Sequence, residues 1–397
     1  MFLDLGRMAI ANNFISSENY LKVSENIYPL KAYVCDSCFL VQVPSILGEK
    51  DIFTSDYVYH SSVSSSWLEH CSAYAGKATS IFKLNSNSMV VEIGSNDGYM
   101  LQNFKRNNIP CLGIEPTDST AAIAKEKGID TRVEFFSEAL AQRIIKENKF
   151  ADLIICNNVI AHVPDLNNFV RGLKIVLKQN GAISLEFPHL IKMIEAVEFD
   201  TIYHEHFSYF SFLALKTIFE FHGFEVFDVE ELKTHGGSLR VFIKHRGAKD
   251  YKVARNVQDL IDYEKSLRVD SLSFYRGFHD KVLKVKMNFL EFLIQEKKKN
   301  KKIVGFGAAA KGNTFLNYCG VRSDMIDYVV DDTSTKQYKF LPQSGIPVYP
   351  VDKLKADKPD IVIIIPWNFK EEILKKIKFI KEWGGQSVIY IPSIKIY

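Results

Sequence analysis

The sequence predicts an α/β protein in which two Rossmann-like units follow a small N-terminal module. A short apolar run, a glycine turn and a helical pattern follow one another at 90–104 and again at 303–314. Apolar runs between these regions end in polar residues, which is typical of strands buried on both faces of a parallel sheet. The first part of the chain lacks this alternation. We therefore expect domains at 1–75, 76–246 and 247–397.

Length and composition limit the classes of protein to which this chain can belong. Its 397 residues, 47% of them hydrophobic, with 29 Phe and 18 Tyr, suffice for two or three domains with real cores. A formal net charge of +3 is too small to indicate a nucleic acid or an anionic membrane as partner. No apolar run approaches a membrane span, and the first residues lack a signal-peptide pattern. Six cysteines without the pattern of a secreted scaffold favour a reducing, cytoplasmic location.

The N-terminal module contains a C-x-x-C pair, Cys35 and Cys38. Two thiolates at this spacing suit one half of a tetrahedral zinc site. A structural zinc needs four ligands, and no second C-x-x-C is present. His60, His70 and Cys71 could complete a site, although their spacing does not require it. The alternative is a pair of free thiols that remains from a zinc knuckle.

The segment at 57–64, Tyr-Val-Tyr-His-Ser-Ser-Val-Ser, is rich in hydroxyl and aromatic groups and has little periodicity. A loop of this kind can line a polar small-molecule pocket, and Tyr57 is our candidate for that role. The alternative is a surface loop with a packed tyrosine.

The first glycine turn follows the apolar run at 90–93 and has the pattern acidic-x-Gly-x-Asn-x-Gly, formed by Glu92, Gly94, Asn96 and Gly98. Glycines in such a turn allow the backbone to approach a nucleotide-type ligand closely. The turn lacks the full G-x-G-x-x-G spacing of a dinucleotide site. It resembles instead the first motif of S-adenosylmethionine (SAM)-dependent methyltransferases. That resemblance implies that Glu92 and the turn face the amino-acid end of a cationic sulfonium ligand.

Polar residues that end the next predicted strands extend this candidate cofactor site. Glu115 lies about twenty positions after the turn, where doubly wound folds bind ribose hydroxyls. Phe135 follows another short strand, and it either covers an adenine or packs in the core. Asn157, Asn158 and His162 emerge from the strand that begins at 152. Because ligands of open α/β sheets bind outside the carboxyl ends of strands, we expect these side chains at one site.

The densest polar run in the chain is Tyr-His-Glu-His at 203–206. Buried groups of this kind are retained where they are paired or useful. The two histidines resemble a metal pair, but the helical H-E-x-x-H spacing is absent. A general acid/base set is better supported, in which one histidine takes a proton near neutral pH and the glutamate orients or charges it. The alternative is a hydrogen-bonded structural cluster.

A further run of glycines, His-Gly-Gly-Ser-Leu-Arg at 235–240, follows a hydrophobic segment. Ser238 and Arg240 are candidate substrate ligands, because arginine suits a phosphate or a carboxylate. The alternative is an ordinary hairpin with a surface arginine.

The second α/β unit begins with strand, glycine turn and helix at 303–314. Helix N-termini and exposed backbone amides bind phosphate, and Lys311 adds a positive charge. We expect Gly307, Lys311, Asn313 and Asp332 to contact the substrate. Two nucleotide-type units in one chain imply two nucleotide-bearing ligands, or one functional unit and one relic.

Taken together, these motifs resemble the sugar C-methyltransferases that act on nucleotide-linked deoxy-keto-sugars. The resemblance covers nearly the whole chain, and the runs at 203–206 and 235–240 are its most specific parts. It implies a class I methyltransferase domain that binds SAM at 76–246. It also implies a remnant zinc-knuckle domain for the substrate at 1–75 and, at 247–397, a helical linker with a Rossmann-like domain for the sugar nucleotide.

The resemblance also implies a set of catalytic residues. They are Tyr57, His162, Tyr203, Glu205 and His206. Removal of a proton next to a ketone needs a base and a donor that steadies the enolate oxygen. We expect His206 to be the base and Glu205 to orient it. Tyr203 and His162 would bind the enolate oxygen, Tyr57 would close the pocket, and this step needs no metal.

In the family, two C-x-x-C pairs hold zinc, and the opening residues 2–6 would lie just after the first pair. We therefore expect this sequence to begin after that pair. Zinc would then bind only if the missing N-terminal ligands exist. The expected partner is a nucleotide-diphosphate sugar, bound by a monomer or a small homo-oligomer. Three other functions are possible: O-methylation of a sugar, binding of a sugar nucleotide without catalysis, and an NAD-dependent dehydrogenase that uses the turn at 305–312.

Overall fold

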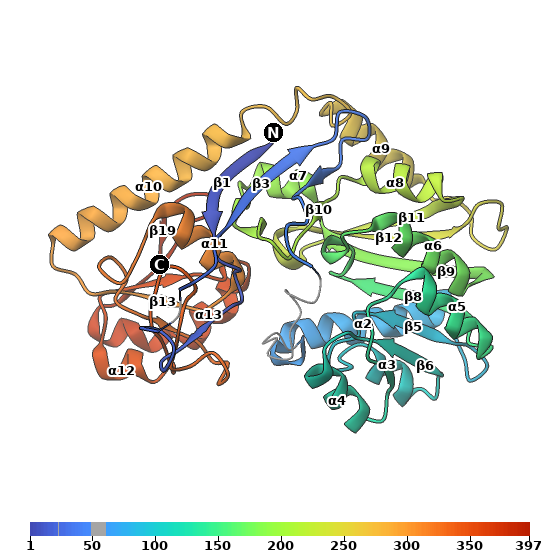
Figure 1. Cartoon of the computed structure of the whole chain (residues 1–397), viewed down its shortest axis with the longest axis horizontal. Coiled ribbons are helices and arrows are strands. Elements are labelled where there is room, and N and C mark those ends of the chain that lie inside the picture. The colour runs from blue at the N-terminus through green and yellow to red at the C-terminus, as the bar shows by residue number, and fades with distance from the viewer. Residues whose placement is uncertain (23, 49–60) are drawn as a thin grey trace.

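The computed structural model describes residues 1–22, 24–48 and 61–397. Two α/β units lie side by side, and the N-terminal strands run between them (Figure 1). Each unit contains one of the two predicted strand–glycine turn–helix motifs, at 90–104 and 303–314, which confirms the predicted fold class. Tyr57 and His60 lie outside the described residues, so their predicted roles stay predictions.

The N-terminal segment, which we expected to be a separate module, pairs with strands of both units. Its strands β1 (Leu3–Met8), β3 (Tyr28–Val34) and β4 (Val41–Gln42) form a sheet in the order β1-β3-β4-β10. The last strand, β10 (Ser208–Tyr209), directly follows the polar run of the first unit. Strand β2 (Ile15–Ser16) pairs with β15 (Lys339–Phe340) of the second unit. A few short strands bury too little surface to be stable alone, so they pair with the larger units.

The first unit is a seven-stranded sheet in the order β11-β12-β9-β8-β5-β6-β7. The five strands from β9 to β7 are parallel, and the hairpin β11–β12 joins β9 antiparallel. The strands are β5 (Val90–Ile93), β6 (Cys111–Ile114), β7 (Asp130–Arg132), β8 (Ala151–Asn157), β9 (Leu177–Pro188), β11 (Phe224–Leu232) and β12 (Ser238–His245). The helices are α2 (Ser65–Ile81), α3 (Leu101–Arg106), α4 (Asp118–Glu126), α5 (Glu138–Lys146), α6 (Leu166–Val176), α7 (Leu190–Glu195) and α8 (Phe212–Phe221). The chain order reverses between β5 and β8, which is where open sheets bind ligands.

The second unit begins with the helices α9 (Arg255–Ser266) and α10 (Phe278–Lys298). Its six-stranded sheet has the order β16-β14-β13-β17-β18-β19, and its edge strand β19 is antiparallel. The strands are β13 (Ile303–Phe306), β14 (Val329–Val330), β16 (Val348–Tyr349), β17 (Ile361–Ile364), β18 (Gln386–Ile389) and β19 (Lys395–Ile396). Helices α11 (Ala310–Cys319), α12 (Lys353–Asp357) and α13 (Lys370–Lys376) connect them. Strand β13 lies between β14 and β17, so the second glycine turn is also at a switch point.

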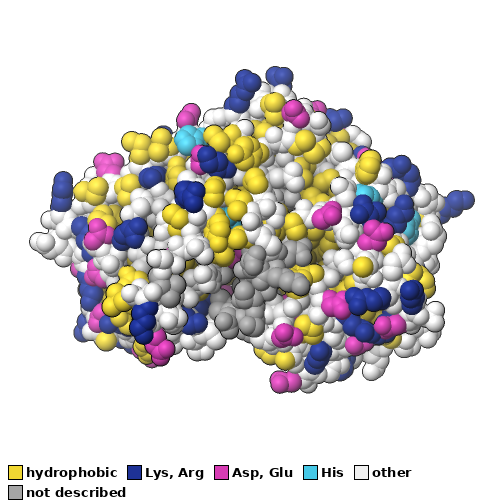
Figure 2. Space-filling view, viewed as in Figure 1, with side chains coloured by type: hydrophobic (Ala, Val, Ile, Leu, Met, Phe, Trp, Pro, Cys, Tyr) yellow, Lys and Arg dark blue, Asp and Glu magenta, His cyan; other side chains and the backbone are white. Residues whose placement is uncertain are grey.

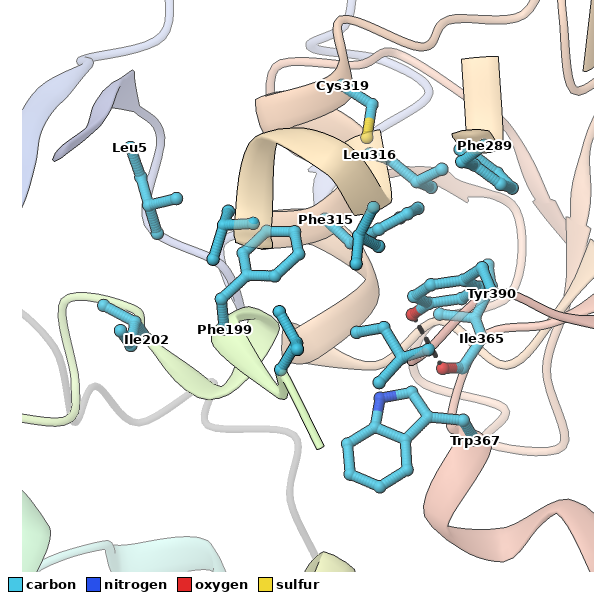
Figure 3. Close-up of a cluster of buried hydrophobic side chains, with 14 of the residues drawn as sticks. Leu5, Phe199, Ile202, Phe289, Phe315, Leu316, Cys319, Ile365, Trp367 and Tyr390 are labelled. Carbon is cyan, nitrogen blue, oxygen red and sulfur yellow. Dashed lines mark hydrogen bonds between the residues drawn. The ribbon is translucent and has the colours of Figure 1, made fainter. Parts of the chain in front are cut away.

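One hydrophobic cluster joins the three parts of the chain (Figure 3). It includes Leu5 of β1, Phe199 of the first unit and Phe315 of the second, and the rings of Phe315 and Tyr390 stack with their centroids 3.8 Å apart. The buried carboxylate of Asp200 accepts a hydrogen bond of 2.8 Å from the indole of Trp367. Because burial of apolar surface is the main stabilising term, we expect the two units to form one rigid frame around whatever binds between them.

The surface carries charges of both signs over both halves of the face in Figure 2, in line with the small net charge. Among the described residues, no helix combines the length and the apolar character that crossing a bilayer requires.

Candidate active site

A cavity of about 360 Å³ lies at the carboxyl edge of the seven-stranded sheet, and all three parts of the chain line it. The N-terminal segment contributes Asn12, and the second unit contributes Lys311 and Lys336. Eleven predicted site residues line this cavity: Gly94, Asn96, Glu115, Phe135, Asn157, Asn158, His162, Tyr203, Glu205, His206 and Lys311. Sequence reasoning missed Asn12 and Lys336, because neither belongs to a recognisable motif.

The two glycines in the turn after β5 are required because side chains of the protein pack closely against them. Gly94 and Gly98 have φ of +69° and +78°. A Cβ atom at Gly94 would lie 2.3 Å from Cγ2 of Val159, and one at Gly98 would lie 2.4 Å from Cδ1 of Ile129. We expected both glycines to admit a ligand. Gly94 does line the cavity, whereas Gly98 does not, since it makes room for Ile129.

Glu115 ends β6 and points its carboxylate into the turn. Its Oε2 accepts the backbone N–H of Asn96 at 2.9 Å, and its Oε1 accepts that of Thr117 at 2.9 Å. Burial raises the pKa of this carboxyl, while the two amide donors lower it. Each carboxylate oxygen keeps a second lone pair for a ligand hydroxyl in the cavity.

Glu92 lies in the middle of β5 and is fully buried. It does not line the cavity, contrary to the prediction, because the strand places its side chain beneath the turn. The hydroxyl of Tyr99 and the backbone N–H of Leu101 are its nearby donors, and they lower its pKa by less than burial raises it. Burial raises its pKa well above the usual range, so this carboxyl is neutral until a cation comes near.

Two asparagines at the end of β8 point polar atoms into the cavity. Asn157 is buried, and among the described residues neither its Oδ1 nor its Nδ2 has a hydrogen-bond partner. Asn158 adopts a left-handed conformation with φ of +56°, which asparagine tolerates better than most residues. A buried amide without partners is costly, so these atoms fit a polar ligand.

The imidazole of His206 is held in one tautomer. Its Nδ1 lies 2.9 Å from the carbonyl oxygen of Thr201, in the short helix η3 (Phe199–Thr201). A carbonyl only accepts, so Nδ1 carries the proton and Nε2 carries the lone pair. Nε2 is 2.9 Å from the hydroxyl of Tyr203, which therefore donates to it. Burial lowers the pKa of His206 well below its usual value, so the ring is neutral at pH 7.

His162, in the short helix η2 (Ile160–His162), places its ring edge-on to His206 with the centroids 4.6 Å apart. Burial lowers the pKa of His162 to about 4. Glu205 does not orient His206 as predicted: its Oε1 accepts a hydrogen bond of 2.7 Å from Nδ2 of Asn12. The carbonyl of Thr201 holds the imidazole instead. Burial raises the pKa of Glu205 to about 7, so this carboxyl exchanges a proton near neutral pH.

The two histidines at 204 and 206 do not form a metal pair. Nε2 of His204 faces the carbonyl of Pro29 at 3.3 Å, on the side of the N-terminal sheet. The chain turns at 203–206, where the backbone N–H of His206 donates to the carbonyl of Tyr203 at 2.9 Å, so the two rings leave the backbone in different directions.

Two lysines form a positive end of the cavity. Lys311 is near the start of α11, with Nζ 4.5 Å from the ring centroid of Trp367. Nζ of Lys336 donates to the carbonyl of Ala308 at 3.0 Å. Burial lowers the pKa of both side chains, and nearby carboxylates oppose that effect. Two amines beside the second glycine turn suit an anionic group.

Arg240 and Ser238 do not reach the cavity. The guanidinium of Arg240 is buried and binds Glu186 at 2.5 Å and Glu230 at 3.3 Å. Both sequence interpretations are therefore wrong, since Arg240 is neither a substrate ligand nor a surface residue. Ser238 donates its hydroxyl to the carbonyl of Thr234 at 3.0 Å and is also buried.

Three predicted residues of the second unit also lie away from the cavity. Gly307, with φ of +93°, leaves room for Pro366. Asn313 donates to the carbonyl of Ala11 at 2.5 Å and so fixes the N-terminal segment. Asp332 is exposed and pairs with a surface lysine, because it lies beyond the end of its strand.

The thiols of Cys35 and Cys38 are free and partly exposed. His70 is engaged by a buried glutamate, and Cys71 is buried in a helix, so neither is available to complete a zinc site. Among the described residues, no group of three or more His, Cys, Asp or Glu could hold a metal ion. The zinc prediction therefore depends on ligands outside this part of the chain.

Comparisons with known proteins agree with this arrangement. Family models match residues 1–53 ("Putative zinc binding domain"), 67–229 ("Methyltransferase domain") and 233–392 ("C-methyltransferase C-terminal domain"). C-methyltransferase NovU of Streptomyces niveus is 30% identical over 394 residues, which is 99% of this chain and 93% of NovU. Ubiquinone biosynthesis O-methyltransferase of Paramagnetospirillum magneticum is 23% identical over 28% of this chain and 45% of its own length. A solved structure of magnesium protoporphyrin IX methyltransferase from Synechocystis covers 45% of this chain and 83% of its own, with 13% identity and a TM-score of 0.37.

Proposed function

Since this chain belongs to the C-methyltransferase family that includes NovU, we propose that it transfers a methyl group from SAM to a carbon next to the ketone of a nucleotide-linked deoxy-keto-sugar. The observation that carries the proposal is a neutral imidazole, His206, which lines the cavity between the two α/β units and whose Nε2 lone pair is engaged only by Tyr203 among the described residues. Membership of a methyltransferase family favours catalysis over binding of a sugar nucleotide alone.

The residues at the first glycine turn fit SAM. The carboxylate of Glu115 can accept the ribose hydroxyls, and the unpartnered amide of Asn157 can bind further polar atoms. The buried carboxyl of Glu92, whose pKa burial raises, would ionise in the field of a cation. SAM supplies an electrophilic methyl group on a positively charged sulfur.

The opposite end of the cavity fits the diphosphate of a sugar nucleotide. Lys311 and Lys336 bring two positive charges to the second glycine turn. A diphosphate there would leave the sugar in the middle of the cavity, near the histidines. Charged hydrogen bonds of this kind are strong where water is excluded.

The proton transfer follows from the tautomer of His206. Nε2 removes the carbon-bound proton, and the carbonyl of Thr201 stabilises the resulting imidazolium through Nδ1–H. In this structure the hydroxyl of Tyr203 donates to Nε2. The lone pair of Nε2 becomes free when this hydroxyl donates to the substrate instead. Tyr203 and His162 then face the oxygen on which negative charge develops. The negative carbon attacks the methyl group, and its electron pair forms the new carbon–carbon bond as sulfur leaves with its own pair.

O-methylation of a sugar on the same scaffold is the nearest alternative, but it needs a base beside a hydroxyl and no donor for an enolate. A screen of nucleotide-linked 4-keto-sugars with methyl-labelled SAM, read by tandem mass spectrometry, separates the two. The proposal predicts label on a ring carbon and no transfer to the same sugar after reduction of its ketone. Label on oxygen, or transfer to the reduced sugar, would overturn it.

We also propose a cytoplasmic location. All cysteines of the described residues are free thiols, as a reducing compartment requires.

A further inference from the structure

His235 lines the cavity, although its own ring has no task in the reaction derived above. It belongs to the short helix η4 (Thr234–Gly236), in the turn of the hairpin β11–β12. Its ring lies 5.4 Å from that of Trp67 in α2 and 6.5 Å from that of Phe369 in the second unit, between centroids. His235 therefore stands where the two α/β units meet, between the diphosphate end and the histidine cluster.

The polar atoms of this ring are open to the cavity. Within residues 1–22, 24–48 and 61–397, neither ring nitrogen of His235 makes a hydrogen bond or an ion pair. Its ring packs against aromatic faces, and the charged groups of Lys311 and Glu186 lie close enough to act on its pKa. The ring nitrogens are not among the buried polar atoms that lack a partner, so they are open to water or to a ligand in the cavity.

The backbone of His235 is strained. Its φ and ψ are +52° and +30°, a left-handed conformation that a histidine adopts only at a cost. Asparagine or glycine would suit that conformation better. Such strain persists where the surroundings impose it, and it concentrates at ligand sites.

The surroundings of η4 hold it firmly. Oγ1 of Thr234 donates to Oε1 of Glu186 at 2.9 Å, and Glu186 is buried and paired with Arg240. Gly236 packs so closely against Glu198 that a Cβ atom would lie 2.4 Å from its carboxylate. This network explains the burial of Arg240, which sequence reasoning had assigned to the substrate itself.

We propose that His235 is a substrate-binding residue that hydrogen-bonds a hydroxyl of the sugar, and that the Glu186–Thr234–Arg240 network positions it. The inference rests on the proposed function, because it names a contact to the same substrate. Burial lowers the pKa of His235 to about 4, so the ring is neutral and offers one donor and one acceptor. A neutral ring of that kind matches a hydroxyl better than a phosphate, and Lys311 and Lys336 already serve the anion.

The test separates binding of the sugar from binding of the diphosphate. Calorimetry compares uridine and thymidine diphosphates with their 4-keto-6-deoxyhexose conjugates, for wild type, His235→Asn and His222→Asn. His222 is a matched control, because it bonds Asn167 on the surface of the first unit. We expect His235→Asn to weaken the conjugate about 3- to 10-fold, the loss of one hydrogen bond, with the free diphosphate unchanged. Its Tm should stay the same or rise, because asparagine relieves the left-handed strain.

Thr234→Val is a second variant, since it keeps the volume and removes the bond to Glu186. It should weaken the conjugate in the same direction by a smaller factor and again spare the free diphosphate. If His235→Asn leaves the conjugate unchanged, or lowers Tm and weakens both ligands alike, His235 is structural and the inference is wrong. It is also wrong if the sugar adds nothing to binding in wild type.

These outcomes are distinct from failure of the proposed function. If no keto-sugar is methylated but His235→Asn still loses the sugar-dependent part of binding, the reaction is misassigned and the sugar contact stands. If methylation occurs and binding is unchanged in His235→Asn, the reaction stands and the contact does not.

Discussion

Tyr203→Phe removes a single hydroxyl and tests how the cavity controls its base. The hydroxyl donates to Nε2 of His206 at 2.9 Å, so it engages the lone pair that has to accept the substrate's proton. The ring of Tyr203 also contacts that imidazole, with the centroids 4.1 Å apart, and phenylalanine keeps this contact. The substitution therefore leaves the packing and removes one donor.

The size of the expected effect depends on whether the hydroxyl of Tyr203 bonds the bound substrate or the negative charge that develops during the reaction. A neutral hydrogen bond contributes about 0.5–1.5 kcal/mol, so binding of the keto-sugar should change by less than about tenfold. A donor aimed at negative charge that develops in the reaction contributes about 10²–10³ in rate. We expect kcat to fall by about that larger factor, with KM little changed.

The pH dependence gives a second readout, with a defined sign. A hydrogen bond donated to the lone pair of neutral His206 opposes its protonation, so removal of Tyr203 raises the pKa of His206. The acid limb of kcat/KM should therefore move to higher pH.

Initial rates of methyl transfer between pH 5 and pH 9 measure both effects. Tyr263→Phe is the control, because that hydroxyl bonds Glu195 outside the cavity and its loss should change neither parameter. A Tyr203→Phe enzyme with wild-type kcat, or with its acid limb moved to lower pH, would refute the reasoning.

Three further predictions concern residues around this centre. Asn12→Ala removes a hydrogen-bond donor that lowers the pKa of Glu205, so this pKa should rise above about 7. Infrared difference spectra of the carboxyl stretch measure the titration, and an unchanged titration would contradict the contact. Lys336→Met should raise KM for the sugar nucleotide about tenfold and leave the calorimetric Kd of SAM unchanged, whereas an equal loss for both ligands would contradict a diphosphate site. Arg240→Met leaves the buried carboxylate of Glu186 with His70 and Thr234 as its remaining partners, so unfolding by denaturant should show a loss of about 3 kcal/mol, the lower end for a broken buried pair. A loss below about 1 kcal/mol would contradict the pair.

The outline of the fold could be predicted from the sequence because buried parallel strands appear in it as short, continuous apolar runs. The runs that contain Glu92 and Gly305 are apolar, short and followed by glycine, and they became the central strands β5 and β13. Asn157 and His162 could be placed in the site for a related reason, since the ends of parallel strands meet at one edge of a sheet.

Contacts between distant parts of the chain were not predictable. Asn12 meets Glu205 across 193 positions, and two-residue strands such as β10 have no periodicity to read. Arg240 was misplaced because one sequence gives no sign of the buried Glu186 that neutralises it. The end of a predicted strand shows only approximately where the side chains after it point. Asp332, which follows β14, therefore lies on the surface and not in the site.

The central claim is that neutral His206 removes a proton from the carbon next to a ketone, and hydrogen exchange measures that step without the methyl donor. Wild-type enzyme and a nucleotide-linked 4-keto-sugar are incubated in D₂O without SAM, and NMR follows loss of the proton at that carbon. We predict rapid exchange in wild type and in His222→Asn, and exchange at the enzyme-free rate in His206→Asn. Exchange in His206→Asn at the wild-type rate would contradict the assignment of His206 as the base.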